Sequence, residues 1–176
     1  MTNLEAIYNK YRSRVVAQGD YFRGYDKGQF RWFTLPFDQR EKDSRTAETV
    51  IKVIEDRKSS HPPSVIDMAC GIPYLWELLF EQYGVDKFVG VDLIDPVVMK
   101  SVIGTPKYQY EYVQQSVFHY LMRSNLPTYD IVISGSRKFI HPDTHLKHDT
   151  EFIDSLFPLV KKGGTIVYEY TKVKHL

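Results

Sequence analysis

The feature that most constrains the fold is an alternation of short apolar runs with segments of helical spacing between residues 64 and 170. The runs at 65–69, 88–92 and 130–134 are mostly apolar, as is typical of strands covered by helices on both faces. The full pattern predicts strands over 65–69, 88–92, 108–114, 130–134 and 165–170, and helices over 74–83, 117–122 and 151–160. Asp95 and Pro96 are typical of the cap and first turn of a further short helix. Strand–helix alternation of this kind predicts a mostly parallel α/β sheet with right-handed crossovers.

Two helices are expected before the sheet. One has apolar residues at helical spacing from Leu4 to Val15, with Thr2 as a candidate cap, and the other has Ala47 and Ile54 on one face, with Asp43 or Ser44 as cap. Between them an aromatic segment includes a short stretch, residues 30–35, expected to be extended. We divide the chain into an N-terminal helical and aromatic cap segment, residues 1–60, and a core, residues 61–176, within one structural domain. The cap segment is expected to complete the core, with a lid over a ligand site as the alternative.

Composition excludes several classes of protein. The 176 residues are 43% hydrophobic, but no run approaches the ~20 apolar residues of a membrane span, and the N-terminus does not resemble a signal peptide. The single cysteine excludes an internal disulfide, so a cytoplasmic location is expected. A net charge of +1 does not indicate a dedicated nucleic-acid-binding protein, although a local basic patch would still allow contact with nucleic acid.

The residues that follow the first two strands are the first candidates for a binding site, because ligands of such sheets lie outside the carboxyl ends of the strands. The turn Ala69-Cys70-Gly71-Ile72-Pro73 is small and leads into a helix, whose N-terminus favours an anionic ligand. Asp92 stands 21 positions after Gly71, where a carboxylate is able to accept hydrogen bonds from ribose hydroxyls. The alternatives are a plain tight turn and a solvated aspartate.

Five successive segments resemble, in order and spacing, the motifs of class I S-adenosylmethionine-dependent methyltransferases. They are VIDMACGIPYLWELL, KFVGVDLID, YEYVQQSVF, YDIVISGS and LFPLVKKGGTIVYEY, and the resemblance extends from about Ser64 to Thr171. It implies a Rossmann-like sheet of strand order 3-2-1-4-5 that binds S-adenosylmethionine and transfers its methyl group to an acceptor, which the sequence does not identify.

The resemblance also implies roles for individual residues. Asp67 matches the acidic residue near the methionine end of the cofactor, and Asp92 and Leu93 match the ribose-binding acid and its adenine-packing neighbour. Gln115 and Ser116 stand where the family often has an aspartate that contacts the adenine amino group. Ser134 and Gly135 end the fourth strand, where the methyl group and the acceptor meet. The residues that match the glycine-rich loop are Ala69, Cys70, Gly71 and Pro73.

The chain departs from the family in its loop and in its length. Ala69 and Pro73 replace glycines; the alanine is tolerable if its φ is negative, and the proline if its φ is helical. The family continues into two more strands, which this chain is expected to lack, so the strand at 165–170 is expected to be an open edge. The segment 30–35, a second copy of the chain in a homodimer, or a partner chain would then cover that edge. These departures favour the alternative function, a catalytically inactive methyltransferase-like module that serves as a structural or regulatory partner.

No catalytic constellation stands out, and methyl transfer needs at most one general base. Tyr21, His119 and His141 are unranked candidates for that base, and Arg45 is a candidate partner of the methionine carboxylate. A basic cluster from Arg137 to His148 would suit an acidic substrate, with a solvated loop as the favoured alternative. His141, Asp143, His145 and His148 lie close enough in sequence to be considered as metal ligands, but Pro142 is not typical of one regular helix, and without a helix their spacing means little, so no metal site is expected.

Overall fold

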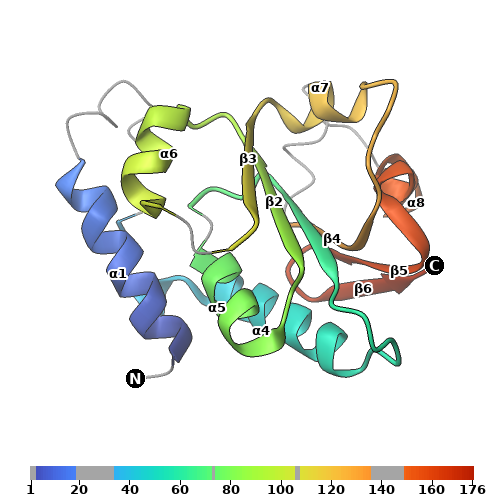
Figure 1. Cartoon of the computed structure of the whole chain (residues 1–176), viewed down its shortest axis with the longest axis horizontal. Coiled ribbons are helices and arrows are strands. Elements are labelled where there is room, and N and C mark those ends of the chain that lie inside the picture. Colours follow the sequence, from blue (N-terminus) through green and yellow to red (C-terminus); the bar gives the residue numbers. More distant parts are fainter. Residues whose placement is uncertain (1–2, 19–33, 73, 106–107, 136–148) are drawn as a thin grey trace.

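The computed structural model describes residues 3–18, 34–72, 74–105, 108–135 and 149–176 (Figure 1). The strands are β1 (Ser64–Met68), β2 (Lys87–Asp92), β3 (Tyr110–Gln114), β4 (Tyr129–Ser134), β5 (Val160–Tyr168) and β6 (Lys172–His175). The helices are α1 (Asn3–Ala17), α4 (Glu41–Glu55), α5 (Tyr74–Tyr83), α6 (Pro96–Ile103), α7 (Val117–Leu121) and α8 (Asp149–Leu156), with short 3₁₀ turns at Phe37–Gln39 and Phe157–Leu159.

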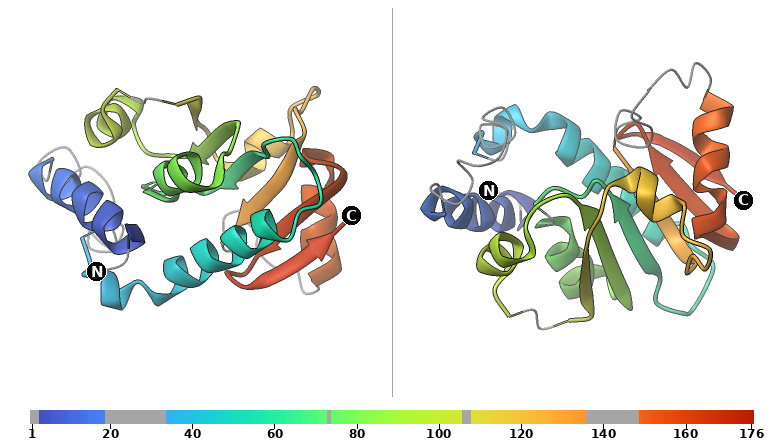
Figure 2. Two further views of the ribbon diagram at one scale, coloured as in Figure 1. Left: turned by 60° about the horizontal axis from the view of Figure 1, so that its bottom comes forward. Right: turned by 90° about the horizontal axis from the view of Figure 1, so that it is seen from above.

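These strands form one sheet of order β3-β2-β1-β4-β5-β6. The first five are parallel, which confirms the predicted order 3-2-1-4-5. Alternate residues of each inner strand pack into two different cores. Val65, Phe88 and Ile131 belong to the core under α1, α4, α5 and α6, whereas Ile66, Val89 and Val132 belong to the core under α7 and α8. The helices therefore cover both faces of the sheet, as predicted (Figure 2).

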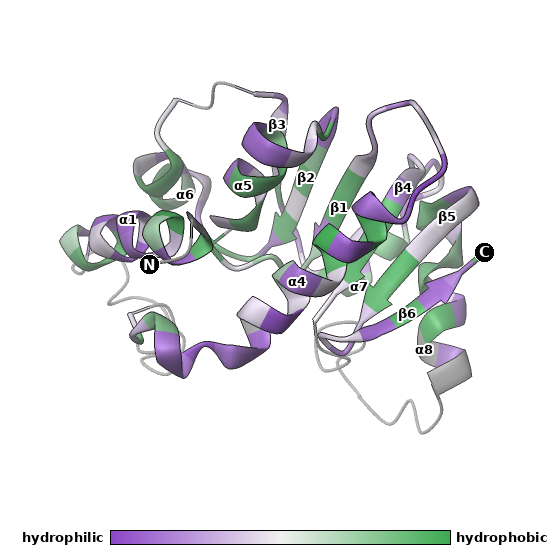
Figure 3. Ribbon diagram, turned by 90° about the horizontal axis from the view of Figure 1, so that it is seen from below, coloured by the Kyte–Doolittle hydropathy of each residue, from purple (hydrophilic) through white to green (hydrophobic). Residues whose placement is uncertain are grey.

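The prediction that the fifth strand forms an open edge of the sheet was wrong. β6 pairs antiparallel with β5, from Thr165 opposite His175 to Tyr168 opposite Lys172, so neither the 30–35 segment nor a partner chain is needed there. Thr34 and Leu35, the part of that segment within the described residues, lie against α1 instead: their carbonyls accept hydrogen bonds from Arg12 and Tyr8. β6 is exposed along its whole length and largely hydrophilic (Figure 3), so no apolar pattern marked it as a strand.

Two further boundaries differ from expectation. α4 begins at Glu41 after Arg40, not at Asp43 or Ser44, because the 3₁₀ turn at Phe37–Gln39 runs directly into the helix and the Ser44 amide already donates to the Arg40 carbonyl. The strand predicted to start at residue 165 begins earlier, because β5 runs from Val160 through Lys162–Gly164. Gly163 has a φ of 79°, and the register with β4 shifts between Tyr129 and Ile131. The glycines therefore make an irregularity in the strand and not its start.

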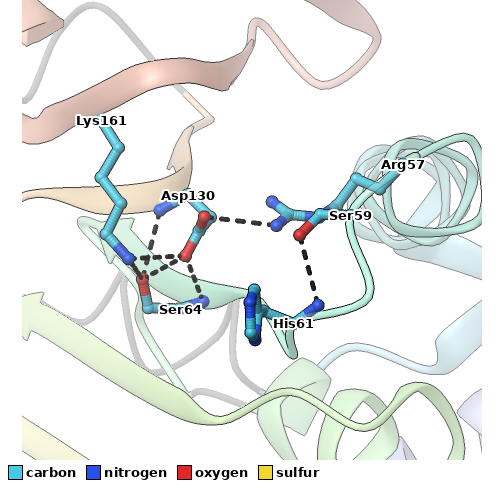
Figure 4. A network of polar contacts seen from close by, with 6 residues as sticks. All are labelled: Arg57, Ser59, His61, Ser64, Asp130 and Lys161. Carbon is cyan, nitrogen blue, oxygen red and sulfur yellow. Dashed lines mark hydrogen bonds and ion pairs between the residues drawn. The ribbon is translucent and has the colours of Figure 1, made fainter.

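Asp130 joins the amino ends of three strands (Figure 4). Its carboxylate accepts hydrogen bonds from the Ser64 amide at 2.9 Å and hydroxyl at 2.7 Å, from Lys161 Nζ at 2.8 Å and from Arg57 Nη2 at 3.2 Å. Partial burial acts to raise the pKa of Asp130, but these hydrogen bonds together hold it well below its usual range. The network joins β1, β4 and β5 at their amino ends, opposite the carboxyl ends at which the candidate site lies.

Candidate functional site at the carboxyl ends of the strands

The candidate site lies where β1, β2 and β4 end. The connections from β1 run through β2 to β3 on one side, while β4 leads to β5 on the other, so the strand order reverses between β1 and β4. A parallel sheet offers a crevice for a ligand at such a reversal. Asp67 pairs with Gly90 in register, and Met68 pairs with Ser134, which brings the predicted residues of three strands to one edge.

The turn after β1 is wound in a left-handed conformation at two positions. Gly71 has a φ of 57°, which glycine adopts without strain, but Ala69 has a φ of 61°. The negative φ at which an alanine would be tolerated here without strain is therefore not the one that Ala69 adopts. Its Cβ is held in a conformation that costs roughly 1–2 kcal/mol for an L-residue. Pro73, the other replacement in this loop, lies outside the described residues.

Asp92 connects the end of β2 to this turn. Its Oδ2 accepts a hydrogen bond from the Gly71 amide at 2.7 Å, and its Oδ1 accepts one from the Leu93 amide at 2.6 Å. Burial raises the pKa of the carboxyl above its ordinary value, while the backbone hydrogen bonds act in the opposite direction. The Ile94 amide also donates a backbone hydrogen bond to this carboxylate. A carboxylate has about four acceptor positions, so one remains for a ligand after the bonds from Gly71, Leu93 and Ile94.

Gly90 provides the space that the turn occupies. A Cβ at Gly90 would lie 2.8 Å from Cys70 Sγ and 3.0 Å from Tyr110 Oη, closer than packed atoms approach one another. Gly90 and Tyr110 were not among the site residues predicted from the sequence. The available signal was a glycine inside the apolar run FVGV, since a glycine within a strand often marks a close approach.

Gln115 and Ser116 lie beside the end of β2. The Gln115 amide donates to the Asp92 carbonyl at 2.9 Å, and the Gln115 side chain accepts from Arg123 Nε at 2.9 Å. The Ser116 hydroxyl caps α7 and lies 2.7 Å from Nδ1 of His119, one of the candidate bases. Leu93 is 59% exposed at this edge, so a ligand ring would have access to its side chain.

The end of β4 is covered by the β5–β6 turn. Ser134 is buried, and its carbonyl accepts a hydrogen bond from the Glu169 amide at 3.1 Å. Glu169 and Tyr170 both have positive φ, and the Tyr170 ring would contact a Cβ at Gly135 at 3.3 Å. Residues 165–170 were expected to form one strand, so this turn beside Ser134 was missed.

The remaining candidates are not placed at the site. Arg45 forms an ion pair with Glu41 on the exposed side of α4. Tyr21, His141 and the whole cluster from Arg137 to His148 lie outside the described residues. Within the described ranges no three His, Cys, Asp or Glu side chains gather as a metal site, and no helix is long and apolar enough to cross a membrane.

A cavity of about 420 Å³ lies next to the site, between α6 and β3. Its lining residues are Pro96, Met99, Lys100, Ile103, Gly104, Thr105, Tyr110 and Tyr112. The Tyr112 hydroxyl donates to the Ile94 carbonyl at 2.6 Å and so holds the segment that follows Asp92 against β3.

Comparison with known proteins relates this arrangement to a fold. The sequence matches no protein-family model and no curated protein. The plantazolicin methyltransferase BpumL, solved with SAH and a monoazolic desmethylPZN analog, is similar over 95% of this chain at 15% identity, with a TM-score of 0.58. The 1,6-didemethyltoxoflavin-N1-methyltransferase of Burkholderia thailandensis, solved with S-adenosylhomocysteine, is similar over 96% at 16% identity, with a TM-score of 0.56. The chain has the class I methyltransferase fold.

This methyltransferase fold is matched over 62% of the BpumL chain and 64% of the Burkholderia chain, so the present chain spans less than two thirds of either. A chain in the complex between the Haloferax volcanii Trm112 methyltransferase activator and a second protein is also similar. The match covers 73% of the present chain and 54% of the chain in the complex, at 14% identity and a TM-score of 0.51.

Proposed function

We propose that the chain is an S-adenosylmethionine-dependent methyltransferase whose cofactor lies over the ends of β1 and β2. The observation that carries the proposal is the hydrogen bond between Asp92 and the Gly71 amide, because it joins the acidic residue and the glycine turn that the resemblance assigns to one ligand. Two structures of the same fold were solved with S-adenosylhomocysteine or SAH, which supports the choice of cofactor.

The residues at this edge suit the parts of such a cofactor. Asp92 would accept a hydrogen bond from a ribose hydroxyl through its remaining acceptor position. Leu93 would pack on the adenine ring, with Gln115 and Ser116 beside the adenine amino group. Asp67 would attract the ammonium group at the methionine end. The loop residues Ala69, Cys70, Gly71 and Pro73 would lie against the middle of the ligand.

When bound, the cofactor would supply an electrophilic methyl group on a sulfonium, whose transfer breaks the S–CH₃ bond and leaves a neutral thioether. The chain's own contribution would be alignment: it would hold the methyl group near Ser134 and Gly135, where the acceptor arrives. Where the acceptor atom carries a proton, that proton would pass to His119, to another base or to water.

The inactive module remains the second candidate, because Ala69 is strained and both Asp92 oxygens already accept backbone hydrogen bonds. Such a module would act through a partner protein, and the similarity to a complex with a methyltransferase activator is compatible with a partner.

Calorimetric titration with S-adenosylmethionine and S-adenosylhomocysteine tests the proposal. The wild-type protein is expected to bind both, and Asp92→Ala is expected to bind neither, while Asp86→Ala, before β2, serves as the control. An absence of wild-type binding at millimolar ligand would end the proposal. Binding without methyl transfer to any acceptor tried, when the Asp92→Ala protein is folded and does not bind, would favour the inactive module.

A further inference from the structure

The Tyr110 hydroxyl is a buried polar group without a hydrogen-bond partner among the described residues. Tyr112, two residues later on the same strand, donates to the Ile94 carbonyl at 2.6 Å and so satisfies its hydroxyl. A buried hydroxyl that makes no hydrogen bond destabilises the fold, so an unpaired one calls for an explanation.

The unpaired hydroxyl points beneath the turn of the candidate site. Tyr110 Oη lies 3.0 Å from the position of a Cβ on Gly90, and Cys70 Sγ lies 2.8 Å from the same position. Gly90 pairs in register with Asp67 on the neighbouring strand. The hydroxyl therefore lies under the loop, on the face of the sheet to which the Asp67 side chain also belongs.

Tyr110 is held in this orientation by other rings. Its ring centroid is 5.2 Å from that of Trp76 and 6.1 Å from that of Phe88. Burial, and then the neighbouring Cys70 and other groups that include Asp67, raise the pKa of Tyr110 well above its ordinary value. The phenol therefore keeps its proton and is a hydrogen-bond donor.

We infer that Tyr110 is a cofactor-binding residue that donates a hydrogen bond to the carboxylate at the methionine end of S-adenosylmethionine. The inference rests on the proposed function. That end of the ligand carries one ammonium and one carboxylate; Asp67 suits the ammonium, and the carboxylate needs a donor nearby. Arg45, which the sequence offered for this purpose, is paired with Glu41 and 57% exposed at its side chain. The phenol under the loop is a donor with no other acceptor among the described residues.

Tyr110→Phe tests the inference with three ligands: S-adenosylmethionine, S-adenosylhomocysteine and 5′-methylthioadenosine, which has the adenine and ribose but lacks the amino-acid end. The variant is expected to bind the first two about 3- to 10-fold more weakly, the loss of one hydrogen bond, and to bind 5′-methylthioadenosine as the wild type does. Without ligand its Tm is expected to be unchanged or to rise by roughly 2–4 °C, because the unpaired hydroxyl is removed.

Tyr112→Phe is the matched control. It removes a satisfied hydroxyl from the same strand and cavity, so its Tm is expected to fall while the ratio of the affinities for S-adenosylhomocysteine and 5′-methylthioadenosine stays as in the wild type. If Tyr110→Phe weakens all three ligands equally, or none, the inference is overturned. A wild-type protein that binds none of the ligands would instead overturn the proposed function.

Discussion

Asp92 Oδ2 lies 2.7 Å from the backbone nitrogen of Gly71, so the end of β2 is bonded to the turn that follows β1. The turn is thus fixed by the same side chain that is proposed to hold the ribose. Ligand binding and the shape of the empty loop are therefore coupled at this residue.

The coupling predicts the effect of Asp92→Asn. The amide group has one acceptor oxygen and presents its NH₂ to a backbone N–H, so at least one of the backbone hydrogen bonds is lost and a donor faces a donor. We expect the free energy of unfolding to fall by about 1–3 kcal/mol and S-adenosylhomocysteine binding to be lost. Urea unfolding and calorimetry measure the two effects. A variant that keeps wild-type stability would show that Asp92 does not hold the turn.

Gly90→Ala is expected to displace the turn. Gly90 does not have a positive φ, so the substitution brings no backbone strain, but its Cβ would meet Cys70 Sγ at 2.8 Å. Overpacking of this kind costs about 1–3 kcal/mol. In the double variant with Cys70→Ala the sulfur is gone, and we expect at least half of the lost stability to return. Additive losses in the double-mutant cycle would contradict the contact.

Ala69→Gly is expected to stabilise the protein. At a φ of 61° the change removes the crowding of Cβ, and we expect the free energy of unfolding to rise by about 1 kcal/mol after the entropy cost of a glycine. Ala47→Gly, in the buried middle of α4, is the control and should lower it by about 1 kcal/mol or more. Equal losses in both variants would show that Ala69 is not strained.

Asp130→Asn is expected to change how stability depends on pH. The folded pKa of Asp130 lies below its unfolded value of about 3.9, so its hydrogen bonds stabilise the protein above that pH and stop doing so as the pH falls through the folded value. We expect the variant to be about 1–3 kcal/mol less stable at pH 7, and the difference to shrink below about pH 4. Asp56→Asn, which breaks an exposed pair with Lys52, is the control and should show no such difference. A gap that is constant with pH would contradict the role of the charge.

The buried strands and their order were predictable because burial leaves a pattern in the sequence. β1, β2 and β4 are apolar because helices cover both of their faces, and the predicted helix at 74–83 matches α5. The cap at Asp95 was also predicted correctly, since its side chain accepts from the Val97 amide. Such signals depend on residues close together in the chain.

The features that were missed depend on contacts between distant residues. The strand β6 is exposed and leaves no apolar pattern, and its pairing depends on two positive φ angles at Glu169 and Tyr170, which side chains of that kind rarely adopt. The role of Gly90 arises from Cys70 and Tyr110, which reach it from two other segments. The positive φ of Ala69 likewise follows from how the turn packs and not from alanine itself.

The central place of β1 has a consequence for the order in which the chain acquires its structure during synthesis. Residues 64–114 contain β1, β2 and β3, of which β2 pairs with both of the others, but the other edge of β1 pairs with β4, whose residues follow at 129–134. The edge of β1 that pairs with β4 therefore leaves the ribosome before β4 has been made. That edge is open to wrong pairing until β4 emerges, so a pause in translation before residues 129–134 have left the ribosome would favour aggregation of the nascent chain.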